Sequence, residues 1–298
     1  MSGGDTNSKL SRKKVKIVKV TRNHLITLGV AIFATTLSYA INYSARAGPV
    51  VAASIVGIIG ALFFKGYAVT SYIAAFAGMS STTVIPSIWY APIFGLMAGI
   101  FAILFAKLFV GYGGKAGTTC FCSVNLTLIF FITLGVLGLS QHNVSNHFKP
   151  LTANDLDPVW IVTAVIAGVY GTVGTVLLRE KALQKRKAPN EVVLGPAILG
   201  LATALVLPWI IPTLAGKIAA VVASGTYAGM VSRKILAADV HLVVAGAVVG
   251  LLNVFLATVF IGVGGKLGFM GLLGIALFHY LEAHGHKSTQ PNIVAKVT

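Results

Sequence analysis

Charged side chains are scarce in this chain. They make up 10% of its 298 residues, whereas a typical soluble domain carries about 25%. Apolar residues make up 56%, and the mean hydropathy is +0.87. The charges are gathered into a few stretches, separated by uncharged runs of the roughly 18 residues or more that a membrane-spanning helix needs. The composition therefore excludes an ordinary soluble domain and predicts an integral membrane protein.

Carboxylates are scarcer still, and none lies in the middle of an apolar run. Carriers that couple to protons or sodium commonly place an acid near the midplane of the bilayer, so cation coupling of that kind is not expected. No nucleophile–base set and no phosphate-binding loop is present either. We therefore expect a protein that is not an enzyme and needs no cofactor. The seven acids are Asp5, Asp155, Asp157, Glu180, Glu191, Asp239 and Glu282.

Metal-ligating residues are few as well. Cys120 and Cys122 stand two residues apart in an apolar run, so on a helix they point in different directions and predict neither a disulfide nor a metal pair. His279, Glu282 and His286 would share one helical face, at steps of three and four. The glycine and polar residues around position 285 predict fraying before His286, so no metal site is expected.

Ten apolar stretches run along the chain. Lipid offers no partner for backbone polar groups, and the strand alternation of a barrel is absent, so the fold class is an all-α integral membrane protein. The expected spans are 24–44, 48–64, 67–82, 88–110, 117–139, 158–178, 193–213, 217–232, 241–263 and 267–283.

The basic residues indicate the orientation. With the N-terminus in the cytoplasm, most of the 23 lysines and arginines face inside, as does the C-terminus. Only Arg46, Lys149, Lys217 and Lys266 fall outside. The net charge of +16 is concentrated beside the spans, which is typical of orientation signals and of attraction to anionic lipid at the N-terminus. Nucleic acid is not expected, because no soluble module remains to bind it.

An internal repeat is the most informative pattern. The motif Ala-Gly-Met at 77–79 recurs at 228–230, and Gly-x-Gly-Gly-Lys-x-Gly at 111–117 recurs at 262–268, without a gap in the register. Five spans per copy is an odd number, so the second copy enters from the opposite side, and two inverted five-helix repeats are expected. The architecture resembles, as a class, inverted five-plus-five-helix transporters and channels. The expected parts are a basic tail 1–23, repeat one 24–139, an external linker 140–157, repeat two 158–283 and a C-terminal tail 284–298.

The Gly-x-Gly-Gly-Lys-x-Gly copies are candidate sites. Their glycines predict a break in helical structure that exposes backbone amides, with new helices starting at Thr118 and Phe269. We expect one lysine toward each mouth of a pathway, attracting anions; the alternative is a tight turn whose lysine reaches lipid phosphate. The candidate residues are Gly113, Gly114, Lys115, Gly264, Gly265 and Lys266.

The third and eighth spans are short and end in polar residues. Short segments at corresponding places in two halves favour a site built from broken helices, and Ser80, Ser81 and Ser232 are the candidate hydroxyls there. The alternative is two ordinary spans packed through Gly78 and Gly229.

These patterns favour a passive or facilitative transporter or channel for a small solute, preferably an anion, with its pathway at the interface of the repeats. The alternative is a structural or assembly subunit of a larger membrane complex, in which the glycines only pack helices. The expected partners are the solute and the bilayer, and oligomerisation is left open. Asn143 begins a glycosylation sequon, which has meaning only if the chain passes through a eukaryotic secretory pathway.

Overall fold

The computed structural model describes residues 21–135 and 147–288, with the side chains of Asn154 and of residues from 285 onward excepted. The described residues are helical and contain no strand beyond one bridge between Phe148 and Val259. The basic cluster of the N-terminal tail, Asn143 and the C-terminal tail beyond 288 lie outside this range.

Ten α-helices occupy the described residues, and each falls on one of the ten predicted apolar stretches. Two of them, α1 and α7, continue into the π-helical turns Ala40–Ser44 and Leu178–Leu183. The helices of the first half are α1 (Arg22–Tyr39), α2 (Pro49–Phe63), α3 (Ala68–Gly78), α4 (Ala91–Leu104) and α5 (Lys115–Thr133). Those of the second half are α7 (Pro158–Leu177), α8 (Glu191–Ile210), α9 (Ala215–Ala228), α10 (Asp239–Phe255) and α11 (Lys266–Ser288).

The helix boundaries differ from the prediction around the two glycine-rich motifs. Helices α4 and α10 end at Leu104 and Phe255 rather than at 110 and 263, and the chain then turns back on itself. The predicted starts of α5 and α11 at Thr118 and Phe269 were wrong, because each helix begins at its lysine. The glycine before each lysine has a positive φ, 77° in one case and 81° in the other, which other residues rarely adopt.

Five helical segments are long and apolar enough to cross a membrane by length and composition. They are Arg22–Ser44, Lys115–Thr133, Pro158–Leu183, Glu191–Ile210 and Lys266–His284. Pro49–Phe63, Ile88–Leu104 and Asp239–Phe255 are shorter apolar helices. With 11 and 14 residues, α3 and α9 extend only about 16 and 21 Å, less than the roughly 30 Å core of a bilayer. The set of helices is compatible with a multi-pass membrane protein.

The outer surface of the bundle carries many large apolar side chains. Trp89 is 84% exposed and Trp209 is 91% exposed, and leucine, isoleucine, valine and phenylalanine side chains on most of the helices also point outward. Water disfavours such a surface and lipid does not, because the hydrocarbon of lipid is as apolar as these side chains.

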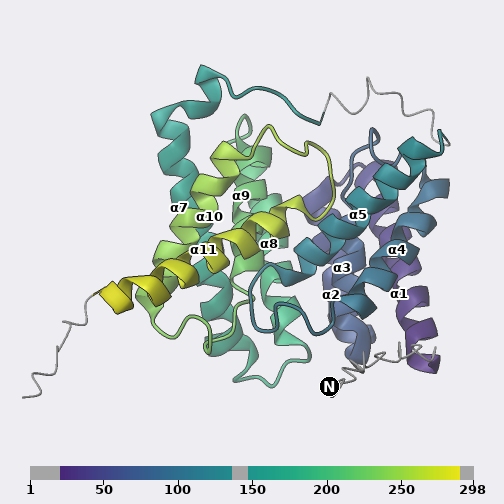
Figure 1. The fold of residues 1–298 in the computed structure, drawn as a ribbon, viewed down its shortest axis with the longest axis horizontal. Helices are drawn as coiled ribbons and strands as arrows, with labels where there is room; N and C mark the ends of the chain where they lie inside the picture. The colour runs from purple at the N-terminus through teal and green to yellow at the C-terminus, as the bar shows by residue number, and fades with distance from the viewer. Residues whose placement is uncertain (1–20, 136–146, 289–298) are drawn as a thin grey trace, which may run out of the picture.

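The two halves of the chain form two groups of helices joined through the centre. Helices α1 to α4 lie together on one side and α7 to α10 on the other, while α5 and α11 meet between them (Figure 1). Within each group, α1 packs on α3 and α4, and α7 packs on α9 and α10. Between the groups, α2 packs on α8, and α5 packs on α11.

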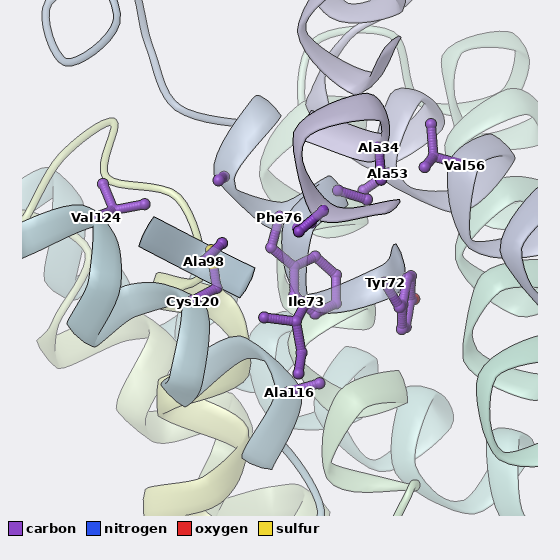
Figure 2. Close-up of a cluster of buried hydrophobic side chains, with 14 of the residues drawn as sticks. Ala34, Ala53, Val56, Tyr72, Ile73, Phe76, Ala98, Ala116, Cys120 and Val124 are labelled. Atoms are coloured by element: carbon purple, nitrogen blue, oxygen red, sulfur yellow. The ribbon is translucent and has the colours of Figure 1, made fainter. Parts of the chain in front are cut away.

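Small side chains dominate the interior. Ala34, Ala53 and Ala98 are fully buried around the rings of Tyr72 and Phe76 (Figure 2). Gly78 lets α3 approach α1 so closely that a Cβ there would lie 2.6 Å from Thr35 O and from the Ser38 side chain. Close backbone approach through glycine and alanine is how helices associate where no water is displaced.

Candidate functional site

The two copies of Gly-x-Gly-Gly-Lys-x-Gly, here called the glycine–lysine elements (residues 111–117 and 262–268), pack directly against each other inside the protein. A Cβ placed on Gly117 would lie 2.5 Å from Gly268 Cα, and the converse distance is the same. Gly113, Gly114, Gly264 and Gly265 are all buried. The expectation that the two elements lie far apart at opposite mouths was therefore wrong: they meet at the centre.

Each element also packs on the end of the short helix from the other half. The amide of Ser81, just after α3, donates to Gly262 O at 2.8 Å. The amide of Ser232, just after α9, donates to Gly111 O at 2.8 Å. These two hydrogen bonds join equivalent positions at the 151-residue offset, with the halves exchanged. Each half thus closes the backbone of the other.

The expected exposed amides are in part absent. Gly114 donates its N–H to Tyr227 O at 2.6 Å, and Gly264 donates its N–H to Ser80 Oγ at 3.0 Å. The positive end of α5 also lies beside the negative end of α9, and dipole ends worth about half a charge each offset one another. A full lysine charge is not offset in this way, so any attraction for anions rests on the lysines and arginines.

Both lysines make the same contact. Lys115 Nζ donates to Ala106 O at 2.7 Å, and Lys266 Nζ donates to Ala257 O at 2.9 Å. Each bond closes the turn that follows α4 or α10, and the acceptors are again 151 residues apart. An ammonium group has three donors, so each lysine keeps donors for a further acceptor.

Lys266 lies in a cavity of about 420 Å³, here called the first cavity. Helices α9 and α11, the second glycine–lysine element and the end of α3 form most of its wall. Its charged lining residues are Asp155, Lys217 and Lys266. Asp155 accepts hydrogen bonds from Thr152 Oγ1 at 2.7 Å and from Thr152 N at 2.9 Å, and these donors lower the pKa of its carboxyl.

Lys115 lies in a separate cavity of about 720 Å³, here called the second cavity. Its wall comes from α3, the first glycine–lysine element, the end of α7 and the segment after α9. Its charged lining residues are Lys115, Arg179, Glu180 and Arg233.

Two arginines hold this second wall in place. Arg179 donates from Nη1 to Gly229 O at 2.8 Å, beyond the last turn of α9, and its buried Nε has no partner among the described residues. Arg233 binds Glu180 through two hydrogen bonds of 2.6 and 2.8 Å, and its Nη2 lies 2.8 Å from Asp239. These carboxylates raise the pKa of Arg233, with the Glu180 bond contributing most.

The predicted site residues fall into two groups. Gly264, Gly265 and Lys266 line the first cavity, and Lys115 and Ser232 line the second. The others line neither cavity and instead hold the backbone together: Gly113, Gly114, Ser80 and Ser81.

Three aromatic residues at the centre were not predicted from the sequence. The rings of Phe76 and Tyr227 lie 4.6 Å apart, and both residues line the first cavity. The ring of Tyr72 lies 4.4 Å from that of Phe76. Phe76 and Tyr227 are separated by 151 residues, but the change from phenylalanine to tyrosine hid their equivalence.

The histidines of α11 have other partners. His279 Nδ1 lies 3.0 Å from Tyr112 Oη, and Glu282 lies 3.3 Å from His241 Nδ1. The side chain of His286 lies outside the described residues. Among the part of the chain that the structure describes, no three histidine, cysteine or acidic side chains gather around a metal-sized space.

No family model matches the chain, and neither a curated protein nor a solved structure matches it. The charges, burial and contacts of the described residues therefore carry the functional proposal.

Proposed function

We propose that this chain is a passive or facilitative membrane transporter or channel for a small anion, with its pathway between the two halves. One observation carries the proposal: two separate cavities reach the central contact of the halves, and each holds one of the two equivalent lysines. A purely structural pair of lysines has no need of a cavity at each.

We further propose that the halves are inverted five-helix repeats, of which residues 24–139 and 158–283 are the copies. The reciprocal hydrogen bonds of the glycine–lysine elements support it. The first helices support it too, since Thr35 Oγ1 donates to Ala74 O and Thr172 Oγ1 donates to Gly225 O, 151 residues further on. An odd number of helices per copy requires inversion if every helix crosses the bilayer.

In this arrangement the chain crosses the membrane ten times with both termini in the cytoplasm. The second cavity, beside Arg179 and Arg233, then faces the cytoplasm, and the first cavity, beside Asp155 and Lys217, faces the other side. The short helices α3 and α9 end near the centre, where α11 and α5 begin. Paired broken helices of this kind surround the binding sites of many transporters.

The charges that line the cavities favour anions. The first cavity has two lysines and one aspartate, and the second has one lysine, two arginines and one glutamate. A single charge near bulk water contributes about 1 kcal/mol or less to the local free energy of an anion, and more in a narrow apolar passage. Several such charges of one sign concentrate anions at both entrances.

The alternative is a structural or assembly subunit. The glycines favour it to a degree, because Gly113, Gly114, Gly117 and Gly268 each touch backbone of the opposite half. Close packing of this kind is also what a rigid pathway requires, so the glycines do not separate the two functions.

Flux through the purified protein separates them. The protein is reconstituted into liposomes, and uptake is measured for a panel of anions and small neutral solutes, with empty liposomes as the control. We expect anion uptake that saturates little and needs no proton or sodium gradient. Tight, folded reconstitution without uptake of any solute would favour the structural subunit.

A further inference from the structure

The two cavities are separated by a partition one helical turn thick. On α3, Phe76 lines the first cavity and Ile73, three residues earlier, lines the second. After α9 the order is reversed: Tyr227 lines the first cavity and Met230, three residues later, lines the second. One turn of helix rises about 5.4 Å, so little more than the side chains of these two segments closes the path between the cavities.

Aromatic rings fill this partition. Phe76 and Tyr227 meet at 4.6 Å with their planes inclined by 53°, and Tyr72 meets Tyr227 edge to face at 5.9 Å. All three side chains are buried. In Figure 2, Tyr72 and Phe76 project from α3 into the core beside Ile73. The lysines and arginines line the cavities on either side, so the partition itself is aromatic rather than charged.

The hydroxyl of Tyr72 is the polar group of this cluster that stands out. The residue is fully buried, and its Oη has no hydrogen-bond partner among the described residues. A buried polar group without a partner costs about 1–3 kcal/mol. By contrast, the buried Tyr39 hydroxyl donates to Ile85 O at 2.8 Å. An unpaired donor beside a partition between two cavities fits a polar solute that visits it.

We propose that Tyr72, Phe76 and Tyr227 form the selectivity constriction of the pathway and pass monovalent, weakly hydrated anions. This inference rests on the proposed function. A hydroxyl donor and the positive edges of aromatic rings favour an anion. They cannot replace a full hydration shell, and the free-energy penalty of dehydration rises with the square of the charge. The constriction therefore favours iodide, nitrate or thiocyanate over sulfate or phosphate.

The test measures uptake of iodide, nitrate, chloride and sulfate by liposomes that contain the full chain. The unmutated protein is expected to take up iodide and nitrate at least tenfold faster than sulfate. Phe76→Ala opens the constriction, so it is expected to raise chloride uptake severalfold and to narrow the ratio of iodide to sulfate. Phe76→Leu is a milder change for use if the alanine variant does not fold.

The hydroxyl is tested by Tyr72→Phe, which keeps the ring and removes the donor. Uptake of all monovalent anions is expected to fall severalfold. Tyr39→Phe removes a buried hydroxyl away from both cavities, and Phe94→Ala removes a buried ring of α4 that lines neither cavity. Both controls are expected to leave the iodide-to-sulfate ratio unchanged.

The outcomes separate the two proposals. If the unmutated protein takes up no anion, the proposed function is overturned, and the constriction with it. If anions are taken up but sulfate passes as fast as iodide, the proposed function stands and the constriction is overturned. The constriction is likewise overturned if uptake is selective but Tyr72→Phe and the Phe76 variants match their controls.

Discussion

Gly117 of α5 and Gly268 of α11 touch backbone to backbone, and each occupies the space where a side chain of the other would be. Each Cα lies 2.5 Å from the position of a Cβ on the opposite residue. The contact brings the first turns of both helices together and holds Lys115 and Lys266 on either side of the crossing. The spacing of the two lysines therefore depends on two missing side chains.

Enlarging this contact is predicted to destabilise the protein. Gly268→Ala places a methyl group against the Gly117 backbone, which cannot move aside as a flexible side chain does. Overpacking of this kind costs about 1–3 kcal/mol. The apparent midpoint of thermal unfolding in detergent is expected to fall by several degrees.

Gly29→Ala is the matched control, because a Cβ on this helical glycine of α1 has no atom within 4 Å. Its midpoint is expected to stay the same or to rise slightly, since alanine favours the helix. Equal midpoints for both variants would contradict the packing role assigned to the crossing.

The positions of the helices could be predicted from the sequence because long uncharged runs leave few other places for them. The breaks at the two glycine–lysine elements could also be predicted, since Gly114 and Gly265 take positive φ. Their contact could not be. It joins residues about 150 positions apart, and neither copy of the motif carries a local sign of its partner.

The correspondence of the first helices was also hidden. Asn42 donates to Gly78 O at 3.3 Å and Arg179 donates to Gly229 O at 2.8 Å, so an amide and a guanidinium make the same contact in the two halves. The residues differ in size and charge, and insertions shift them out of the 151-residue register. Equivalence of this kind is encoded in the carbonyl that each side chain reaches, which only the fold reveals.

Neutralising the lysines is predicted to reduce anion uptake. Lys115→Gln and Lys266→Gln each remove a positive charge from one cavity while keeping a donor for the carbonyl at Ala106 or Ala257. Each variant is expected to lower uptake severalfold, and the double variant more. The differences should shrink as salt rises, because the Debye length falls from about 30 Å at 0.01 M to about 10 Å at 0.1 M.

Lys107→Gln is the control, since Lys107 lies in the same turn as Lys115 but lines neither cavity. Uptake by this variant is expected to match the unmutated protein. If Lys115→Gln and Lys266→Gln also match it, the lysines only close their turns, and the preference for anions loses its main support.

The membrane topology is predicted to place residues 8, 184 and 288 on one side. Single cysteines at Ser8, Gln184 and Ser288, in a background with Cys120 and Cys122 replaced by alanine, are labelled with an impermeant maleimide in oriented membranes. All three should react from the cytoplasmic side, because the basic residues gather there. A cysteine at Ala153, in the linker before α7, should react only from the opposite side. Labelling of any of the first three together with Ala153 would contradict the ten-pass arrangement.

The last prediction concerns Glu180, the acidic residue among those that line the second cavity. Glu180→Gln leaves Arg233 its second partner, Asp239, so the wall should keep its shape. The pair is about one-third exposed, and ion pairs of such exposure contribute about 1 kcal/mol or less to stability.

Removing the carboxylate leaves three positive charges in the cavity unopposed. Anion uptake at low salt is therefore expected to rise about twofold to fivefold, which corresponds to about 1 kcal/mol or less. Glu191→Gln removes an acid that lines neither cavity and should leave uptake unchanged. The increase should disappear at high salt, as screening requires. A fall in uptake for Glu180→Gln with an unchanged thermal midpoint would mean that the carboxylate itself binds the solute, and the preferred solute would then be a cation.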